Sequence, residues 1–130
     1  MASVQKFRKE NGKTKFLFTG DIEDEAQTRI ADKYANEKDK EYKIDLIKMP
    51  HHGSASPKSV NGTGSLYRFI RTFMPDYAVI SVGEGNSYGH PHKETLSLLE
   101  DADAKVYRTD IHGDIIVKSD GKSLMIETSK

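Results

Sequence analysis

Three short polar clusters in this chain each follow an apolar, strand-like run. The first is Thr-Gly-Asp at 19–21, the second is His-His-Gly-Ser at 51–54, and the third is Gly-His-Pro-His at 89–92. Together they hold four of the five histidines and one carboxylate. Carboxylate oxygens and imidazole nitrogens are ligands that divalent metal ions take in proteins. The clusters therefore predict a metal-assisted site, provided that the fold brings them together.

The segments between the clusters predict how they could meet. Strand-like patterns occupy residues 4–8, 15–19, 44–49, 77–82, 106–108, 115–118 and 124–128. Helical spacing of apolar residues follows each cluster, over 22–34, 66–73 and 91–99. The order β-β-α-β-α-β-α-β-β-β is typical of a layered α/β fold. Residues beyond the carboxyl ends of parallel strands converge on one crevice, so the clusters are expected to share it.

Two hairpins are expected at the ends of the chain. Asn11-Gly12 is a turn signal between the first two strands, which predicts that residues 4–8 pair with residues 15–19. Ser-Asp-Gly-Lys at 119–122 is a turn signal between the last two strands.

Composition narrows the kind of protein. The 130 residues suit one domain or part of a larger one. Lys+Arg and Asp+Glu both number 20, so no overall basic field attracts nucleic acid, although a phosphodiester held by a metal is still compatible. With no cysteine, any metal must be held by nitrogen and oxygen. No apolar run approaches the roughly 18 residues of a spanning helix. We expect a soluble chain, and the sequence leaves open whether its parent is cytoplasmic, extracellular or membrane-anchored.

Asp21 stands where a strand gives way to a helix, and two roles fit that place. A carboxylate there can coordinate or bridge metal ions. It can also be the N-cap that accepts hydrogen bonds from the first helical amides, and aspartate is a leading N-cap residue. Taken alone, Asp21 favours the cap.

His51 and His52 follow a buried strand and precede small residues. Adjacent side chains at a strand end point in opposite directions, so one imidazole can enter a metal shell while the other supports it or touches substrate. Gly53 lets the backbone approach closely, and Ser54 offers a hydroxyl to an anion. The alternative is a pair of surface histidines that bind nothing.

His90 and His92 flank Pro91, whose fixed φ stiffens the segment. His90 could be a ligand or a proton carrier, because histidine titrates near neutral pH. His92 could bind a carboxylate or the substrate. Asn86 and Tyr88, just upstream, carry polar groups suited to an oxyanion or a phosphate. The alternative is a helix N-terminus at which histidines fill polar positions.

Read in order, several motifs resemble one known pattern. They are Phe-Leu-Phe-Thr-Gly-Asp at 16–21, Lys-Met-Pro-His-His-Gly-Ser at 48–54, Ala-Val-Ile-Ser-Val-Gly at 78–83, Tyr-Gly-His-Pro-His at 88–92 and Val-Tyr-Arg-Thr-Asp at 106–110. Together they are similar to the C-terminal half of metallo-β-lactamase superfamily hydrolases of the ComEC-like type. That group includes the hydrolase domain of the competence DNA-uptake protein and stand-alone relatives. The resemblance implies an αβ/βα sandwich, of which residues 1–130 supply the C-terminal half.

The resemblance also implies roles for the clusters. Asp21 would bridge two metal ions, usually zinc, with manganese or another divalent ion as alternatives. His52 is favoured over His51 as a ligand of the second metal. A metal-activated hydroxide would attack a phosphodiester in a small molecule or a nucleic acid, with Asp21 and His90 as catalytic groups. The substrate-binding groups would be Ser54, Asn86, Tyr88, His90 and His92.

One departure from the family limits what the chain can do. The family's principal metal motif, His-x-His-x-Asp-His, belongs to an N-terminal half and has no match here. Asp21, His52 and His90 give at most three ligands. We therefore expect a fragment that binds metal weakly, hydrolyses little by itself, and self-associates through uncovered sheet surface in place of its missing half. The alternative function is a non-catalytic domain that binds an anion or a partner on the same scaffold.

Overall fold

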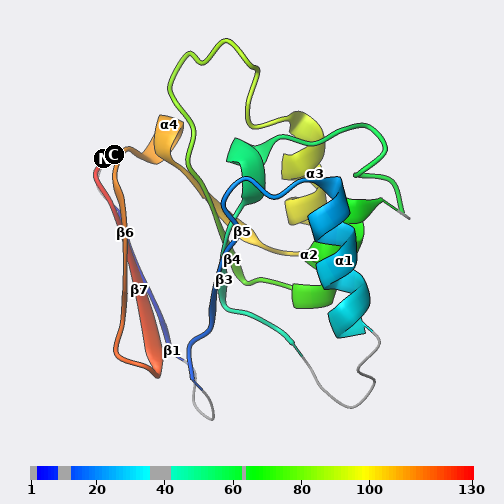
Figure 1. Ribbon diagram of the computed structural model, residues 1–130. Helices are drawn as coiled ribbons and strands as arrows, with labels where there is room; N and C mark the ends of the chain where they lie inside the picture. Colours follow the sequence, from blue (N-terminus) through cyan, green and yellow to red (C-terminus); the bar gives the residue numbers. More distant parts are fainter. Residues whose placement is uncertain (1–2, 9–12, 36–41, 63) are drawn as a thin grey trace.

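The structure is a computed structural model that describes residues 3–8, 13–35, 42–62 and 64–130. Its strands form an antiparallel sheet in the order β1-β7-β6 and a parallel sheet in the order β2-β3-β4-β5 (Figure 1). The strands are β1 (Ser3–Arg8), β2 (Phe16–Phe18), β3 (Leu46–Lys48), β4 (Tyr77–Ile80), β5 (Lys105–Arg108), β6 (Ile115–Ser119) and β7 (Ser123–Thr128). The helices are α1 (Asp24–Ala35), the 3-10 helix η1 (Pro50–Gly53), α2 (Ser65–Phe73), α3 (Lys93–Asp101) and α4 (Thr109–His112).

The parallel sheet is built from strands in sequence order, each joined to the next by a helix. The helices α1, α2 and α3 all cover one face of this sheet, and the antiparallel sheet lies on the other side (Figure 1). Strand–helix–strand connections that all turn with the same hand place their helices on one face. The predicted element order and the α/β class are confirmed, with η1 and α4 as additional short turns.

The predicted N-terminal hairpin is wrong. β1 pairs with β7 from Ser3↔Thr128 to Arg8↔Ser123, whereas β2 pairs in parallel with β3. Its supposed turn, Asn11-Gly12, lies outside the described residues. The alternating pattern of residues 4–8 marks a strand but carries no information about its partner, and the six-residue β7 offers a longer ladder than the three-residue β2. The C-terminal hairpin of β6 and β7 is confirmed.

Side chains of the parallel strands alternate between two apolar layers, as the two-residue period of a strand requires. Ile47, Ala78 and Ile80 face the helices. The neighbouring positions, Leu46, Tyr77 and Tyr107, face the antiparallel sheet and form a second cluster with Leu124 and Ile126 of β7.

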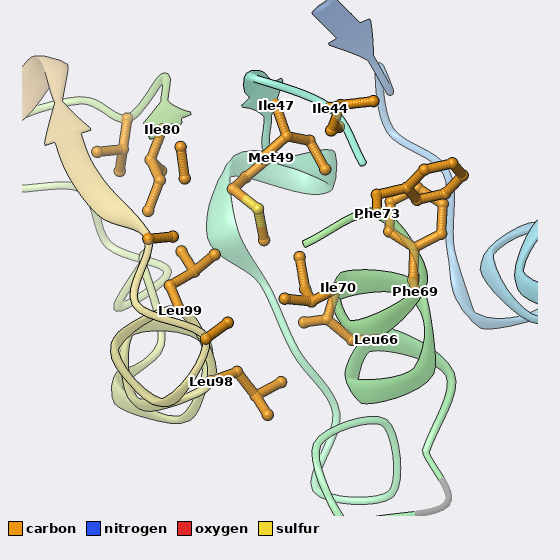
Figure 2. Packing of buried hydrophobic residues seen from close by; sticks show 14 residues of the cluster. Ile44, Ile47, Met49, Leu66, Phe69, Ile70, Phe73, Ile80, Leu98 and Leu99 are labelled. Atoms are coloured by element: carbon orange, nitrogen blue, oxygen red, sulfur yellow. The ribbon is translucent and has the colours of Figure 1, made fainter. Parts of the chain in front are cut away.

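The larger core lies between the parallel sheet and the helices (Figure 2). Leu66, Phe69, Ile70 and Phe73 of α2 repeat with helical spacing and form one buried stripe. Full burial of such a side chain stabilises the fold by roughly 1.5–3 kcal/mol. This core fixes the strands, and the strands in turn fix the loops at their carboxyl ends.

The space between the two sheets is less closed at the β2 side. Phe16 and Phe18 are 37% and 77% exposed. Together with side chains of β3, β4 and β6 they line an open cavity of about 300 Å³. An apolar surface of this kind is unusual unless another segment covers it.

Candidate functional site

The three polar clusters meet at the carboxyl edge of the parallel sheet, as predicted. The in-register pairs Phe18↔Lys48 and Lys48↔Val79 align the strand ends, so the loops after these strands emerge side by side. The ring centroids of His51 and His52 are 6.5 Å apart, and those of His51 and His90 are 6.2 Å apart. The ring centroids of His90 and His92 are 4.9 Å apart, so four histidines form one group, which we call the histidine cluster: His51, His52, His90 and His92.

Backbone hydrogen bonds hold the loops in place. The His51 N–H donates to the Gly20 carbonyl at 3.0 Å, which joins the first cluster to the second. The Gly53 carbonyl accepts from the His92 N–H at 3.1 Å and from the Thr95 hydroxyl at 2.8 Å, which joins the second to the third. The relative positions of the clusters are therefore set by the backbone, independently of any ligand.

Gly53 is the point of closest approach between two of these loops. Its φ is +77°, and a Cβ added there would lie 2.6 Å from the Cβ of Pro91. Only glycine fits this conformation and this gap. The peptide bond between His90 and Pro91 is cis.

His51 and His52 lie in η1 on left-handed backbone, with φ of +48° and +55°. Such a conformation costs a non-glycine residue roughly 1–3 kcal/mol. We expected the two rings to point in opposite directions because we assumed an extended strand end. The chain forms a left-handed turn there, so that reasoning does not apply. Two consecutive residues in this conformation point to a geometry that the surrounding fold imposes at some cost in stability.

His52 has the arrangement of a metal-ligating histidine. Its Nδ1 lies 2.7 Å from the Ser81 carbonyl oxygen. A carbonyl only accepts, so Nδ1 carries a proton, and in the neutral ring Nε2 keeps its lone pair. That Nε2 lies 3.8 Å from Oδ1 of Asp21. In metal sites the ring nitrogen away from the metal commonly donates to a backbone carbonyl in this way.

Asp21 is not a helix cap. It lies in a turn in which the Ile22 N–H donates to the Thr19 carbonyl at 3.3 Å, and α1 begins only at Asp24. The N-cap alternative is therefore wrong, because this turn separates the strand from the helix. The side chain is 70% exposed and directed to the His52 ring.

Ser54 and His51 border a cavity of about 210 Å³ beside the histidine cluster. Glu23 lies on the same cavity, with Oε1 3.4 Å from Nδ1 of His51. Asp24 also lines it and accepts a hydrogen bond from Ser65 at 2.7 Å. The two carboxylates make this cavity unfavourable for a phosphate. An anion bound by Ser54 would therefore have to lie outside the cavity, toward the histidine cluster.

His90 occupies the centre of the cluster. Its pKa is lowered, first by burial and then by the neighbouring rings of His92, His51 and His52. The imidazole is therefore neutral at neutral pH. Its ring meets the His92 ring edge-on at 4.9 Å and stacks on the Tyr88 ring at 5.6 Å.

The Asn86 side chain is used within its own loop. Its Oδ1 accepts from the N–H of Tyr88 at 3.2 Å and of His90 at 3.0 Å. Its Nδ2 donates to the carbonyls of Gly83 at 3.0 Å and His90 at 2.8 Å. A contact between Asn86 and substrate would displace one of these bonds, so in this structure the residue positions its neighbours.

The His92 ring is bound to the backbone directly after the second cluster. Its Nδ1 lies 3.0 Å from both the backbone nitrogen and the carbonyl oxygen of Ala55. It is also the N-cap residue of α3, although its side chain makes no capping hydrogen bond. His92 therefore lies at a helix N-terminus, as the alternative interpretation expected, and its ring in addition holds the loop to Ala55.

The fit to a metal ion is partial. Across residues 3–8, 13–35, 42–62 and 64–130, no group of three His, Asp or Glu side chains is arranged to hold a metal ion. The pair of Asp21 and His52 fits one side of such a site. Sequence reasoning missed two groups beside the histidine cluster: Glu23, which lies against His51, and the Ser81 carbonyl, which binds His52. Glu23 could have been noticed two residues after Asp21, whereas a backbone carbonyl gives no sequence signal.

Two curated bacterial proteins are similar to this chain, and one of them is named as a competence protein. The chain is 36% identical over 106 residues to ComE operon protein 3 of Bacillus subtilis (strain 168), a match that covers 82% of this chain and 12% of that protein. It is 28% identical over 102 residues to Competence protein ComA of Neisseria gonorrhoeae, covering 78% of this chain and 13% of that protein. The chain thus spans about an eighth of the length of the curated relatives it matches.

No family model matches the chain, and no solved structure matches it significantly. Among the described helices, none has the length and apolar character needed to cross a membrane. The likeness to these two bacterial proteins is therefore what the comparisons contribute.

Proposed function

We propose that this chain forms one wall of the catalytic centre of a metal-dependent hydrolase that cleaves phosphodiesters, with nucleic acid as the preferred substrate class. The proposal joins the histidine cluster to a fold of metallo-β-lactamase type, of which this chain would be the C-terminal half. The competence name of one of the two relatives supports nucleic acid as the substrate.

The observation that carries the proposal is the orientation of the His52 ring and which of its nitrogens holds a proton. The Ser81 carbonyl fixes the proton on Nδ1, so the lone pair of Nε2 is available beside the Asp21 carboxylate. Left-handed backbone at His52 costs stability. A surface histidine that bound no ligand would gain nothing in return from an oriented ring. Asp21 and His52 are accordingly proposed as the ligands that this chain supplies, and His51 is a weaker candidate because its Nδ1 faces Glu23.

The chemistry depends on these groups. A bound divalent ion, zinc or another, would act as a Lewis acid and lower the pKa of a water molecule. The lowered pKa of His90 keeps its imidazole neutral at neutral pH, so the ring has a lone pair that can accept a proton in the same cluster. Asn86 holds the backbone on both sides of this residue and keeps its position constant.

The remaining ligands are proposed to come from another segment of a longer protein. Two features support this: the small share of each relative that the chain spans, and the open apolar cavity beside Phe16 and Phe18. In the absence of that segment, the same apolar surface is proposed to support self-association.

A zinc titration of the 130-residue chain, followed by histidine side-chain NMR, tests the ligand assignment. We expect the His52 ring signals to respond first, and Asp21→Asn or His52→Gln to weaken zinc binding by at least about tenfold, because each removes one of two ligands. His112→Gln serves as the control, since the His112 Nδ1 is bonded to the Arg108 backbone. Equal affinity in all variants would contradict the assignment.

Hydrolysis is tested separately on a longer protein in which the chain is joined to its upstream sequence. Turnover of bis(p-nitrophenyl) phosphate should require metal and should be abolished by Asp21→Ala. Unchanged turnover in that variant would exclude Asp21 as a ligand.

A second candidate is a non-catalytic domain that binds an anion or a partner on the same scaffold. The incomplete ligand set among the described residues favours it. The upstream sequence discriminates between the two candidates. If it carries His-x-His-x-Asp-His, the hydrolase is supported, and if those positions are replaced, the binding domain is.

A further inference from the structure

A row of aromatic rings runs outward from the histidine cluster and ends at Tyr88. The His90 ring meets the rings of His51 and His92 edge-on, at 6.2 Å and 4.9 Å. Its contact with Tyr88 is different, because these two rings are stacked, with centroids 5.6 Å apart and planes 22° apart. Tyr88 is 76% exposed, so the stack leaves most of its ring to solvent.

The position of Tyr88 is fixed by its loop. One oxygen atom, Oδ1 of Asn86, accepts from the backbone N–H of both Tyr88 and His90. The Asn86 amide nitrogen in turn donates to the carbonyls of Gly83 and His90. The backbone that carries the stacked pair is therefore held before any ligand arrives, which reduces the entropy lost on binding.

Packing does not account for this ring. Phe18, which is equally exposed at 77%, lines an apolar cavity between the sheets. Tyr88 belongs to neither of the two apolar cores of the described residues. A large ring presented to solvent on a braced loop, next to four histidines, is suited to contact a flat ligand.

We propose that the outer face of Tyr88 stacks on a base of single-stranded nucleic acid and so positions the adjacent phosphodiester at the histidine cluster. Every base has a π-face, and stacking on an aromatic side chain tolerates any sequence. In a duplex those faces are covered by neighbouring base pairs. The choice of nucleic acid rests on the proposed function, whereas the stacking role rests on Tyr88 itself.

Charge supports a role for stacking over backbone attraction. The chain has 20 basic and 20 acidic residues, so it lacks the general positive field that draws nucleic acid through its phosphates. Base stacking is worth roughly 1–3 kcal/mol per base, which corresponds to about 5- to 150-fold in affinity.

The test measures binding of an oligothymidylate to the 130-residue chain in EDTA, by NMR of the tyrosine ring signals and by fluorescence anisotropy. We expect the Tyr88 ring signals to shift upfield, and Tyr88→Ala to weaken binding at least about fivefold. Tyr88→Phe keeps the ring and should bind like the unchanged protein. Phe18→Ala is the matched control for loss of an equally exposed ring, and should also bind normally.

Two further ligands separate stacking from phosphate contact. An abasic deoxyribose-phosphate oligomer of the same length and a duplex should both bind at least about fivefold more weakly than the single strand. Equal binding of either ligand, a Tyr88→Phe variant as weak as Tyr88→Ala, or no detectable binding of the single strand would each overturn the proposal. Because EDTA removes metal and no cleavage is measured, the result is independent of hydrolysis. If the base stacks on Tyr88 but the longer protein shows no turnover, this inference stands and the hydrolase proposal is weakened. If turnover occurs without stacking, the hydrolase proposal stands and this inference is overturned.

Discussion

In the helix-covered core Phe69 and Leu99 are fully buried. At the carboxyl edge of the same sheet, His51 and His52 lie on left-handed backbone, and their side chains are 40% and 49% exposed. The two regions share the strands β3 and β4, so the difference does not come from the scaffold. It comes from the loops at the strand ends, because the strands are apolar and the loops are rich in histidine and glycine.

The comparison predicts where substitutions lower the free energy of unfolding and where the backbone itself already lowers it. Core residues lie in regular helices and strands and are fully packed, so truncating them weakens the fold. At the edge, positive φ at non-glycine residues is a cost that the rest of the fold must offset. Strained positions of this kind are concentrated at functional sites. Substitutions in the two regions test this contrast, and their expected effects decrease from the core to the edge.

The largest effect is expected in the core. Phe69→Ala should lower the free energy of unfolding by about 3–5 kcal/mol, because it removes a buried ring and leaves a cavity. Phe18→Ala, at a 77% exposed position, should change it by less than about 0.5 kcal/mol. Urea denaturation of both variants provides the measurement. A comparable loss in the two would mean that the β2 side is packed as tightly as the core.

A smaller loss is expected where the loops meet. Gly53→Ala should cost about 2 kcal/mol, because its Cβ would clash with Pro91 and its φ is positive. Gly20→Ala is the control, with a φ of +54° and no heavy atom within 4 Å of the new Cβ, and should cost about 1 kcal/mol. Urea midpoints compare the two, and equal losses would show that the contact with Pro91 is unimportant.

At the edge, the cost of left-handed backbone should itself be measurable. His51→Gly and His51→Ala both remove the ring, but only glycine relieves the left-handed conformation. The glycine variant should therefore be more stable than the alanine variant by about 1 kcal/mol. Thermal unfolding of the pair gives this difference directly. If the alanine variant is the more stable one, the backbone of His51 is not strained and the contrast with the core fails.

The smallest effect concerns pH. The pKa of His90 is lowered in the folded protein from the ordinary value of 6.5, because burial and the neighbouring histidines disfavour its charged form. Below that ordinary value the unfolded chain therefore takes up more protons at this position, and the fold loses stability as the pH falls through this range. Above it this loss disappears.

The measurement is the urea midpoint as a function of pH, with an NMR titration of the ring. His90→Gln should make the midpoint less dependent on pH on the acidic side. A His90 ring that titrates at or above the ordinary histidine pKa would contradict this expectation.

Much of the fold could be predicted from local patterns. The helical spacing of Leu66, Phe69, Ile70 and Phe73 and the apolar runs before each cluster gave the correct element order. The partner of β1 could not be predicted, because alternation specifies a strand but not what it pairs with, and β7 lies at the far end of the chain.

The site was predicted to the level of its clusters and no further. That Asp21, His52 and His90 would meet could be inferred from their places after parallel strands. That Asp21 is not a cap depended on an extra turn before α1, and that Asn86 braces its loop depended on the local geometry of the backbone. Such details depend on the local backbone conformation and on which groups lie nearby in space, and residue types alone do not specify either.

The sequence by itself determined which groups could act together. The periods of apolar residues specify the order of strands and helices, and parallel strands bring their carboxyl ends to one edge of the sheet. Only the tertiary structure decided which atoms face each other there. The Nε2 of His52 is directed to Asp21 because a backbone carbonyl, that of Ser81, binds the other ring nitrogen. Every residue carries such a carbonyl, so its role depends on position in space and not on residue type.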